Sequence, residues 1–233
     1  MQLAPAFAAL TALSLAAGMA RGDGAPVVVE LFTSQGCASC PPADDMLRDL
    51  AGIEGVIPLA LHVDYWDYIG WEDTFGSALF TARQQSYAVA AGERMVYTPQ
   101  LIVGGTDRVI GADPMAVMAL VAAQAEQAPE VTLTLGREGG GLVIAAESGG
   151  MLAQPVVVQL VRFLPLAQVD ILAGENAGQS RTYANVVTDW QVLGDWDGTA
   201  PLLLTAAAPG DEPAVVILQE PGPGRIIAAA ELR

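Results

Sequence analysis

The only two cysteines of this 233-residue chain are Cys37 and Cys40, separated by two residues in a Cys-x-x-Cys motif. An apolar run, residues 27–32, comes before the motif, and Pro41 and Pro42 follow it directly. The run predicts a buried strand, and a proline pair is tolerated in the first turn of a helix. Both thiols are therefore expected at a strand-to-helix junction, where unpaired amides and the helix dipole stabilise a thiolate. Because the thiolate is the reactive form of cysteine, the pair predicts redox chemistry.

The position of each cysteine predicts its role. Cys37 is expected to be the exposed attacking thiol at the helix cap, and Cys40, one turn inside, is expected to resolve a mixed disulfide. The intervening Ala38 and Ser39 carry no positive charge that could stabilise a thiolate further. This predicts a reduction potential nearer the reducing end of the range for such motifs.

Two other interpretations of the cysteine pair remain open. A structural disulfide is one, although a loop of four residues gains only about 2 kcal/mol from closure. A metal site is the other, and the single histidine, His62, is the only further soft ligand that could join the thiolates around copper. A lone histidine on a buried strand is more typical of a satisfied core residue. The redox interpretation is favoured, with no cofactor and no metal in the predicted site.

Charge and terminal composition predict where the protein works. The 26 acidic and 10 basic residues give a net charge of −16, which argues against nucleic acid or an anionic membrane as partner. Residues 1–20 are apolar and uncharged, too few for a membrane span, and resemble a secretory signal peptide in pattern. The small residues Gly18 and Ala20 predict cleavage just before Arg21. We expect a periplasmic or secreted protein with no membrane span.

The first half of the chain alternates between strand and helix patterns. After the first strand, the expected elements are a helix over 41–51, a strand over 56–64, a helix over 77–91, two short strands within 96–110 and a helix over 113–127. A strand, a helix and a strand in so short a span predict a parallel pair with a right-handed crossover.

Residues 26–127 resemble a thioredoxin-like domain. The resemblance rests on the Cys37–Cys40 motif after the first strand and on Thr98-Pro99 before the strand pair. It implies that Pro99 follows a cis peptide bond and faces the disulfide. The whole chain also resembles a family of exported bacterial proteins with a domain of unknown function, through 30–42, 62–71 and 174–176.

The resemblance also implies roles for residues outside the motif. Thioredoxins place a buried acid late in the first strand, where it exchanges protons with the second cysteine, and Glu30 matches that place to within one residue. By strict alternation Glu30 shares a strand face with Val28 and Phe32, and a solvated acid at a sheet edge is the alternative. Thr98 is expected to present its backbone to a substrate strand. Tyr65 and Trp66, from an aromatic loop, could form a wall for peptide substrates or simply pack on the domain.

Beyond Pro129, short β-type runs alternate with glycine-rich turns, a pattern typical of a sandwich or barrel. The predicted fold class is thus an α/β thioredoxin-like domain (β-α-β-α-β-β-α) followed by a β-rich sandwich-like domain. The predicted boundaries are 1–20 for the signal peptide, 21–128 for the first domain and 129–233 for the second. The predicted function is that of an exported thiol-disulfide oxidoreductase-like protein acting on protein or small thiol substrates. The alternative is periplasmic copper handling, or binding without catalysis.

Overall fold

β-Strands dominate the computed structural model, which describes residues 26–233. The first half contains β1 (Val27–Thr33), α1 (Pro41–Leu50), β2 (Val56–His62), the 3₁₀ helix η1 (Asp67–Ile69), α2 (Ala78–Ala90), β3 (Gln100–Val103), β4 (Asp107–Ile110) and α3 (Pro114–Ala125). The second half contains β5 (Val131–Glu138), β6 (Gly141–Ser148), β7 (Val156–Asp170), β8 (Ser180–Trp196), β9 (Leu202–Ala207), β10 (Ala214–Gln219) and β11 (Ile226–Leu232). The predicted signal peptide, residues 1–20, lies outside the described residues.

Local sequence accounts for where these elements begin. All seven residues of β1 are buried, as expected for an apolar strand inside a sheet. The Ser77 hydroxyl accepts a hydrogen bond from the amide of Leu79 at the start of α2, and the Asp113 carboxylate accepts one from Ala116 at the start of α3. Among residues 26–233, no helix has the length and apolar character needed to cross a membrane.

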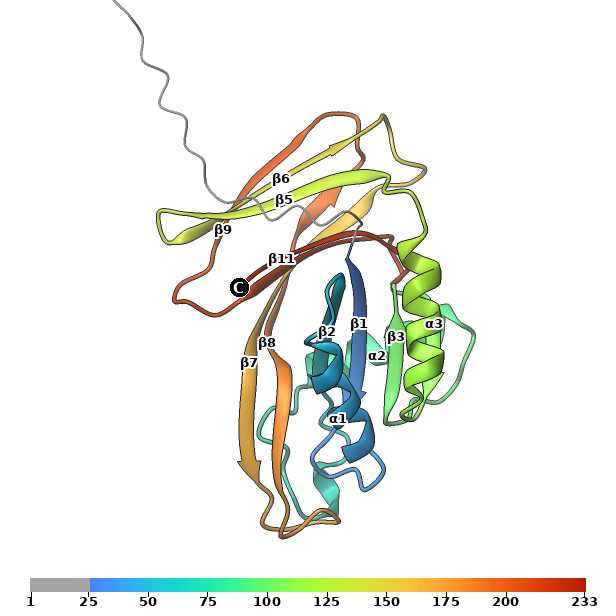
Figure 1. Cartoon of the computed structure of the whole chain (residues 1–233), viewed down its shortest axis with the longest axis vertical. Coiled ribbons are helices and arrows are strands. Elements are labelled where there is room, and N and C mark those ends of the chain that lie inside the picture. Colours follow the sequence, from blue (N-terminus) through green and yellow to red (C-terminus); the bar gives the residue numbers. More distant parts are fainter. Residues whose placement is uncertain (1–25) are drawn as a thin grey trace, which may run out of the picture.

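Two sheets organise the molecule. The larger has eight strands in the order β11-β10-β7-β8-β2-β1-β3-β4, in which β2 pairs parallel with both β1 and β8 and the other neighbours are antiparallel. The smaller is an antiparallel sheet of β5, β6 and β9, which lies across the upper end of the molecule in Figure 1. The long strands β7 and β8 run from that upper layer down past β2 to the lower end (Figure 1).

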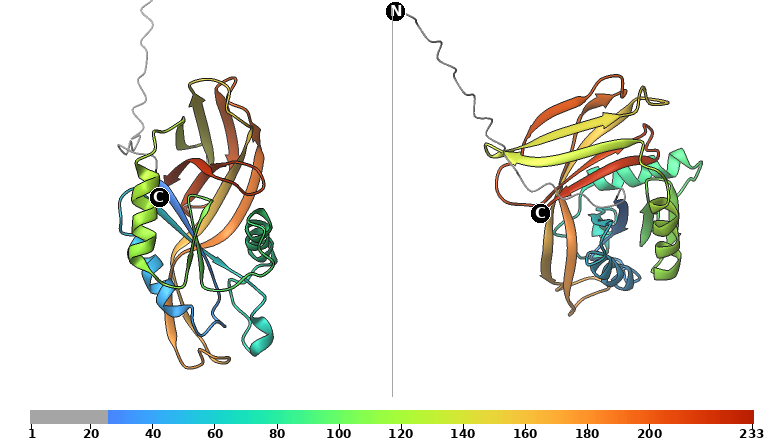
Figure 2. Two further views of the ribbon diagram at one scale, coloured as in Figure 1. Left: turned by 90° about the vertical axis from the view of Figure 1, so that its right-hand side faces the viewer. Right: turned by 45° about the horizontal axis from the view of Figure 1, so that its top comes forward.

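Three apolar clusters fill the space between these layers. Alternate residues of β1 face α1 and α3 on one side of the large sheet and α2 on the other, and the left view of Figure 2 shows the helices on these two sides. The third cluster lies between the small sheet and the β7, β10 and β11 part of the large one. The helix that begins at the cysteine motif, α1, therefore packs on the face opposite α2.

The predicted fold class is wrong. In place of an α/β thioredoxin-like domain followed by a sandwich-like domain, the described chain is mostly β, with three α-helices, a continuous eight-stranded mixed sheet and a three-stranded sheet. The physical reason is the pairing of β8 with β2, at Ala60 and Val186, supported by a hydrogen bond of 2.8 Å from the Asn185 amide to the Pro58 carbonyl oxygen. This pairing extends one sheet through both halves of the chain. The predicted boundary at residues 128 and 129 falls in the connection between α3 and β5.

Candidate active site

The two cysteines form a disulfide between β1 and α1, with their Cα atoms 5.4 Å apart. Cys40 is the N-cap residue of α1 and Pro41 is its first helical residue, so the strand-to-helix junction is where the sequence predicted it. The predicted difference in exposure is wrong, because only 1% of Cys37 and 0% of Cys40 is exposed. The helix starts at residue 41 as predicted, but its cap is Cys40, and Cys37 lies one turn before the helix.

The cis-proline loop lies beside the disulfide. The Thr98–Pro99 peptide bond is cis, as the resemblance implied, and it precedes β3. The hydroxyl of Ser39, an exposed residue, is 3.4 Å from Cys37 Sγ and donates over 3.4 Å to the carbonyl oxygen of Thr98. The motif and the cis-proline loop therefore meet through Ser39.

The aromatic loop between β2 and α2 supports the cis-proline loop. Trp66 Nε1 donates to Thr98 Oγ1 over 2.7 Å, which places the indole of Trp66 next to the predicted substrate-binding residue. The Tyr65 hydroxyl donates to Gln84 Oε1 over 3.1 Å, and the amide of Gln84 in turn donates to the Tyr97 carbonyl oxygen. Burial raises the pKa of Tyr65 to about 12, so this phenol stays a hydrogen-bond donor. The structure thus brings Thr98, Tyr65 and Trp66 together.

Glu30 is placed away from the disulfide. Its carboxylate is fully buried and faces α2, where it pairs with Arg83 Nε at 2.6 Å and accepts a short hydrogen bond from the Tyr87 hydroxyl. Because α1 covers the opposite face of the sheet, Glu30 and the helix that carries Cys40 lie on different sides of β1. The solvated-edge alternative is also wrong, since no part of Glu30 is exposed.

A different carboxyl group lies on the disulfide side. Asp44 is buried four residues after Cys40, so the two share a face of the helix, and the amide of Asp44 donates to the Cys40 carbonyl oxygen over 3.1 Å. The Thr33 hydroxyl donates to Asp44 Oδ1 over 2.7 Å. Burial raises the pKa of Asp44 to about 7, a shift that the Thr33 hydrogen bond only partly offsets. The sequence does show an acidic residue four positions after Cys40, one helical turn away. The thioredoxin-like resemblance instead assigned the proton-exchanging acid to Glu30.

His62 is a core residue in a buried ion-pair geometry. Its Nδ1 lies 2.8 Å from Asp73 Oδ2, both side chains are fully buried, and Nε2 has no hydrogen-bond partner among the described residues. The ring packs edge-on against Phe75 and Tyr183, with centroids 5.3 and 4.9 Å away. Burial alone would raise the pKa of Asp73, but the neighbouring His62 and hydrogen bonds from His62 and backbone amides lower it. Within residues 26–233, no group of three or more His, Cys, Asp or Glu side chains is placed to hold a metal ion.

The tip of the β7–β8 hairpin holds the loop in front of the disulfide. The buried side-chain amide of Asn176 donates to the carbonyl oxygens of Gln35 and Cys37, over 2.9 and 3.0 Å. Gly174 lets the tip approach closely, because a Cβ at its φ of +76° would lie 3.0 Å from the Cβ of Trp71. In addition, the backbone N–H of Gln35 donates a hydrogen bond to Asp73 Oδ2 over 2.7 Å. Glu175 and Asn176 are residue types that suit a turn or a domain contact, but no local pattern identifies Gln35 and Cys37 as the partners of Asn176.

Comparisons with known proteins identify a family and two solved structures that are similar to this chain. Residues 28–219 match the family model described as "Protein of unknown function (DUF1223)". The crystal structure of protein AGR_C_4864 from Agrobacterium tumefaciens is similar, with a TM-score of 0.79, 35% identity, and coverage of 91% of this chain and 96% of that one. HBP35 of Porphyromonas gingivalis has a similar fold, with a TM-score of 0.59 at 16% identity over 90% of this chain and 75% of that one. No curated protein matches the chain. Because the family model spans most of the sequence, the chain belongs to the DUF1223 family of proteins of unknown function.

Proposed function

We propose that this protein is a thiol-disulfide oxidoreductase-like protein that acts through the Cys37–Cys40 pair. The observation that carries the proposal is the disulfide itself, at a helix N-terminus and beside the cis-proline loop, with Ala38 and Ser39 exposed between the cysteines. The helix N-terminus stabilises a thiolate when the bond opens. A four-residue disulfide adds little to stability in a protein with three buried apolar clusters, so a purely structural role explains it poorly.

The proposed reaction is a two-step exchange with a dithiol substrate. A substrate thiolate attacks Cys37 Sγ, forming a substrate–Cys37 disulfide while the sulfur of Cys40 leaves as a thiolate. The second substrate thiolate then attacks the substrate sulfur of that mixed disulfide and releases the sulfur of Cys37. The substrate loses two electrons and two protons, and the protein gains them as two thiols. With a protein disulfide as substrate, the same steps run in reverse.

Asp44 is the proposed partner for the proton of Cys40. It lies one helical turn after that cysteine on the same buried side, and its pKa of about 7 makes both the protonated and the charged form accessible near neutral pH. The leaving Cys40 thiolate takes a proton from the Asp44 carboxyl group, and Asp44 takes it back when the disulfide reforms. Glu30, paired with Arg83 on the other face, has no part in this step.

The loop at Thr98 is the proposed contact for the substrate. Pro99 holds the backbone beside the motif, while Trp66 fixes the Thr98 side chain and Tyr65 supports the loop through Gln84. A peptide segment next to Thr98 would bring its thiol close to Ser39 and Cys37. We also propose export to the periplasm or the medium, where a disulfide persists, on the basis of the apolar residues 1–20.

The test is equilibration of the whole purified chain in glutathione buffers of defined potential, with alkylation to trap free thiols. We expect reversible reduction without unfolding, at a potential nearer the reducing end, and loss of exchange in Cys37→Ser. Exchange with a peptide disulfide should slow in Trp66→Phe more than exchange with glutathione does. The proposal ends if the disulfide stays oxidised in buffers with potentials as low as about −300 mV and is reduced only when the protein unfolds, because such a bond is structural.

A further inference from the structure

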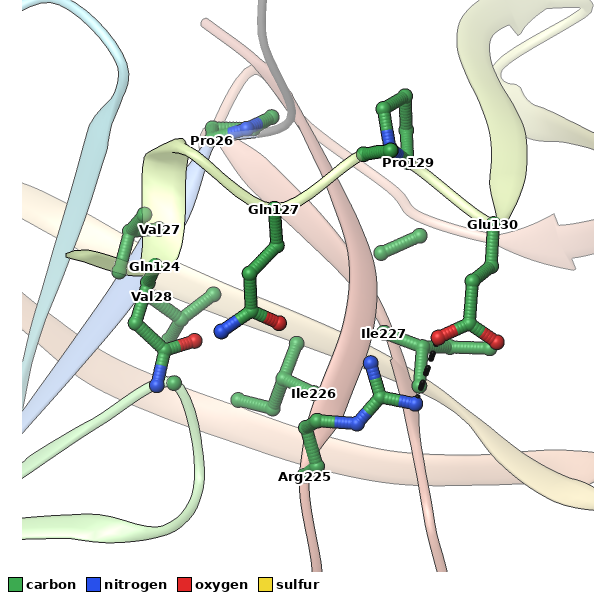
Figure 3. A pocket seen from close by; sticks show the side chains of 13 residues that line it. Pro26, Val27, Val28, Gln124, Gln127, Pro129, Glu130, Arg225, Ile226 and Ile227 are labelled. Carbon is green, nitrogen blue, oxygen red and sulfur yellow. Dashed lines mark ion pairs between the residues drawn. The ribbon is translucent and has the colours of Figure 1, made fainter. Parts of the chain in front are cut away.

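A pocket of about 320 Å³ opens on the α2 side of the large sheet. Its walls come from α2, β7, β8 and the turn after β10, and they include Leu79, Phe80, Val157, Trp190, Val192 and Pro221. By contrast, the hollow in Figure 3, between the end of α3 and β11, has about 40 Å³ and is bordered by the Arg225–Glu130 ion pair. That smaller space holds only about three water molecules, so of these two spaces the pocket beside α2 is the one with room for a ligand.

A polar floor underlies the apolar walls. Arg83 lines the pocket, and the centre of its guanidinium lies 3.9 Å from the centroid of the Trp190 ring. The buried amides of Gln159 and Gln219 are joined to each other at 3.0 Å. Trp190 Nε1 donates to Gln159 Oε1 over 2.8 Å, which fixes the ring at the edge of the pocket. Apolar walls around a few fixed polar groups are the usual composition of a small-molecule site.

The floor carries no uncompensated charge. The Arg83 guanidinium is neutralised by Glu30 at 2.6 Å. At the rim, Glu220 lies 3.3 Å from Arg225, a cation that it shares with Glu130. An anionic ligand would have to compete with Glu30 in a protein whose net charge is −16, and a cationic ligand would meet the guanidinium. An uncharged ligand meets neither cost.

One donor in the floor has capacity to spare. Of the five guanidinium N–H groups of Arg83, Nε donates to Glu30, and Nη2 donates to Tyr87 and Gln219 at 3.0 Å each. Nη1 has two N–H groups and, within residues 26–233, makes one hydrogen bond, to Gln159 Oε1 at 3.4 Å. A ligand oxygen that accepts from Nη1 would therefore complete the hydrogen bonding of the floor.

We propose that this pocket is a second binding site, for a small uncharged molecule with an apolar body and one oxygen atom that accepts a hydrogen bond from Arg83. The volume sets the size of the ligand, since an engineered cavity of about 150 Å³ holds benzene and twice that space suits a two-ring body. The site does not depend on the disulfide, because Glu30 and Arg83 face away from α1. It also gives Glu30 a role unconnected with the cysteines, which is to neutralise the floor.

Three naphthalene probes that differ only in their polar group test this class of ligand. The whole chain is titrated with 2-acetonaphthone, 2-naphthoate and 2-naphthylmethylammonium and followed by amide and indole NMR shifts. We expect the ketone to shift the Trp190 indole and the Val192 amide signals and to bind at least tenfold more tightly than either charged probe. Absence of ketone binding, or equal binding of a charged probe, would overturn the proposal.

Two matched variants check the location. Val192→Asp puts a carboxylate at the pocket wall, at a residue that is 66% exposed and therefore tolerant of change. Leu203→Asp makes the same change on β9, outside the pocket, at a residue that is 71% exposed. We expect the first variant to weaken ketone binding at least tenfold and the second to leave it unchanged. Equal binding by Val192→Asp and the unsubstituted chain would overturn the assignment of the site.

Discussion

The side-chain amide of Asn176 lies 3.0 Å from the carbonyl oxygen of Cys37, across 139 positions of sequence. The same amide nitrogen binds the Gln35 carbonyl oxygen, so one side chain satisfies two buried acceptors of the loop before the disulfide. In Figure 1 the tip of the β7–β8 hairpin that carries Asn176 reaches the lower end of the molecule, near the start of α1. The second half of the chain thereby takes part in the candidate active site.

Removing this clamp should weaken the protein and loosen the disulfide loop. Asn176→Ala leaves two buried carbonyl oxygens without their donor, and we expect a loss of about 1–3 kcal/mol in the free energy of unfolding. Reduction of the disulfide by dithiothreitol should become faster, because the loop is freer to open. Urea unfolding and thiol trapping measure the two effects. Gln168→Ala, at an exposed position of the same hairpin, is the control, and equal behaviour of the two variants would refute the clamp.

Asp44 should make stability fall as the pH rises toward 7. Burial raises its pKa from 3.8 to about 7, so between these values the folded protein holds a proton that the unfolded chain releases. Asp44→Asn keeps the oxygen that accepts from Thr33 but has no proton to lose. Above pH 7 we expect this variant to be the more stable one, by at most about 4 kcal/mol for a shift of this size. Urea unfolding from pH 4 to pH 8 measures it, and parallel curves for the two proteins would contradict the prediction.

Glu30 and Asp44 can be distinguished by the pH dependence of thiol exchange. Glu30→Gln should cost about 3–5 kcal/mol of stability, because Arg83 loses a buried counter-ion. Its exchange rate with glutathione should keep the pH profile of the unsubstituted protein. Asp44→Asn should lose the inflection near pH 7. The assignment of the proton to Asp44 fails if Glu30→Gln alone removes that inflection.

The His62–Asp73 pair should protect the protein at mildly acidic pH. Because the pKa of Asp73 is lowered in the fold, its contribution to stability is present above the ordinary value of 3.8 and is lost as the pH falls through the lower folded value. Asp73→Asn should be less stable than the unsubstituted protein at pH 7, and this difference should shrink below pH 4. Thermal unfolding at several pH values between 2 and 7 measures it. A difference that does not change with pH would mean that Asp73 titrates normally.

Local features of the site could be predicted from the sequence. Proline after a Cys-x-x-Cys motif marks a helix start, and the thioredoxin-like resemblance at Thr98-Pro99 implied the cis bond that the structure contains. Strict alternation also put Glu30 on the same face of β1 as Val28 and Phe32, and all three do face α2. Which helix covers that face depends on tertiary packing. The role predicted for Glu30 required the same side of the sheet as the cysteine helix, and Glu30 lies on the other side.

Contacts between distant segments could not be predicted in this way. The residues of β7 and β8 form apolar runs typical of short strands, and nothing local indicates that they extend to 15 and 17 residues or that Val186 pairs with Ala60. That pairing decides the fold class, because it joins both halves in one sheet. Asn176 stands among ordinary turn residues, and its side-chain nitrogen reaches the Gln35 and Cys37 carbonyl oxygens only once the hairpin lies beside the disulfide loop.

The distance in sequence between Cys37 and Asn176 has a consequence for the order of events during synthesis. A chain made from its N-terminus presents Cys37 and Cys40 long before residue 176 exists, and closing a ring of four residues requires nothing from later segments. The sulfur–sulfur bond can therefore form in an open loop, within reach of any oxidant in the compartment. Formation of the disulfide therefore does not require the hairpin contact that encloses it in the folded protein.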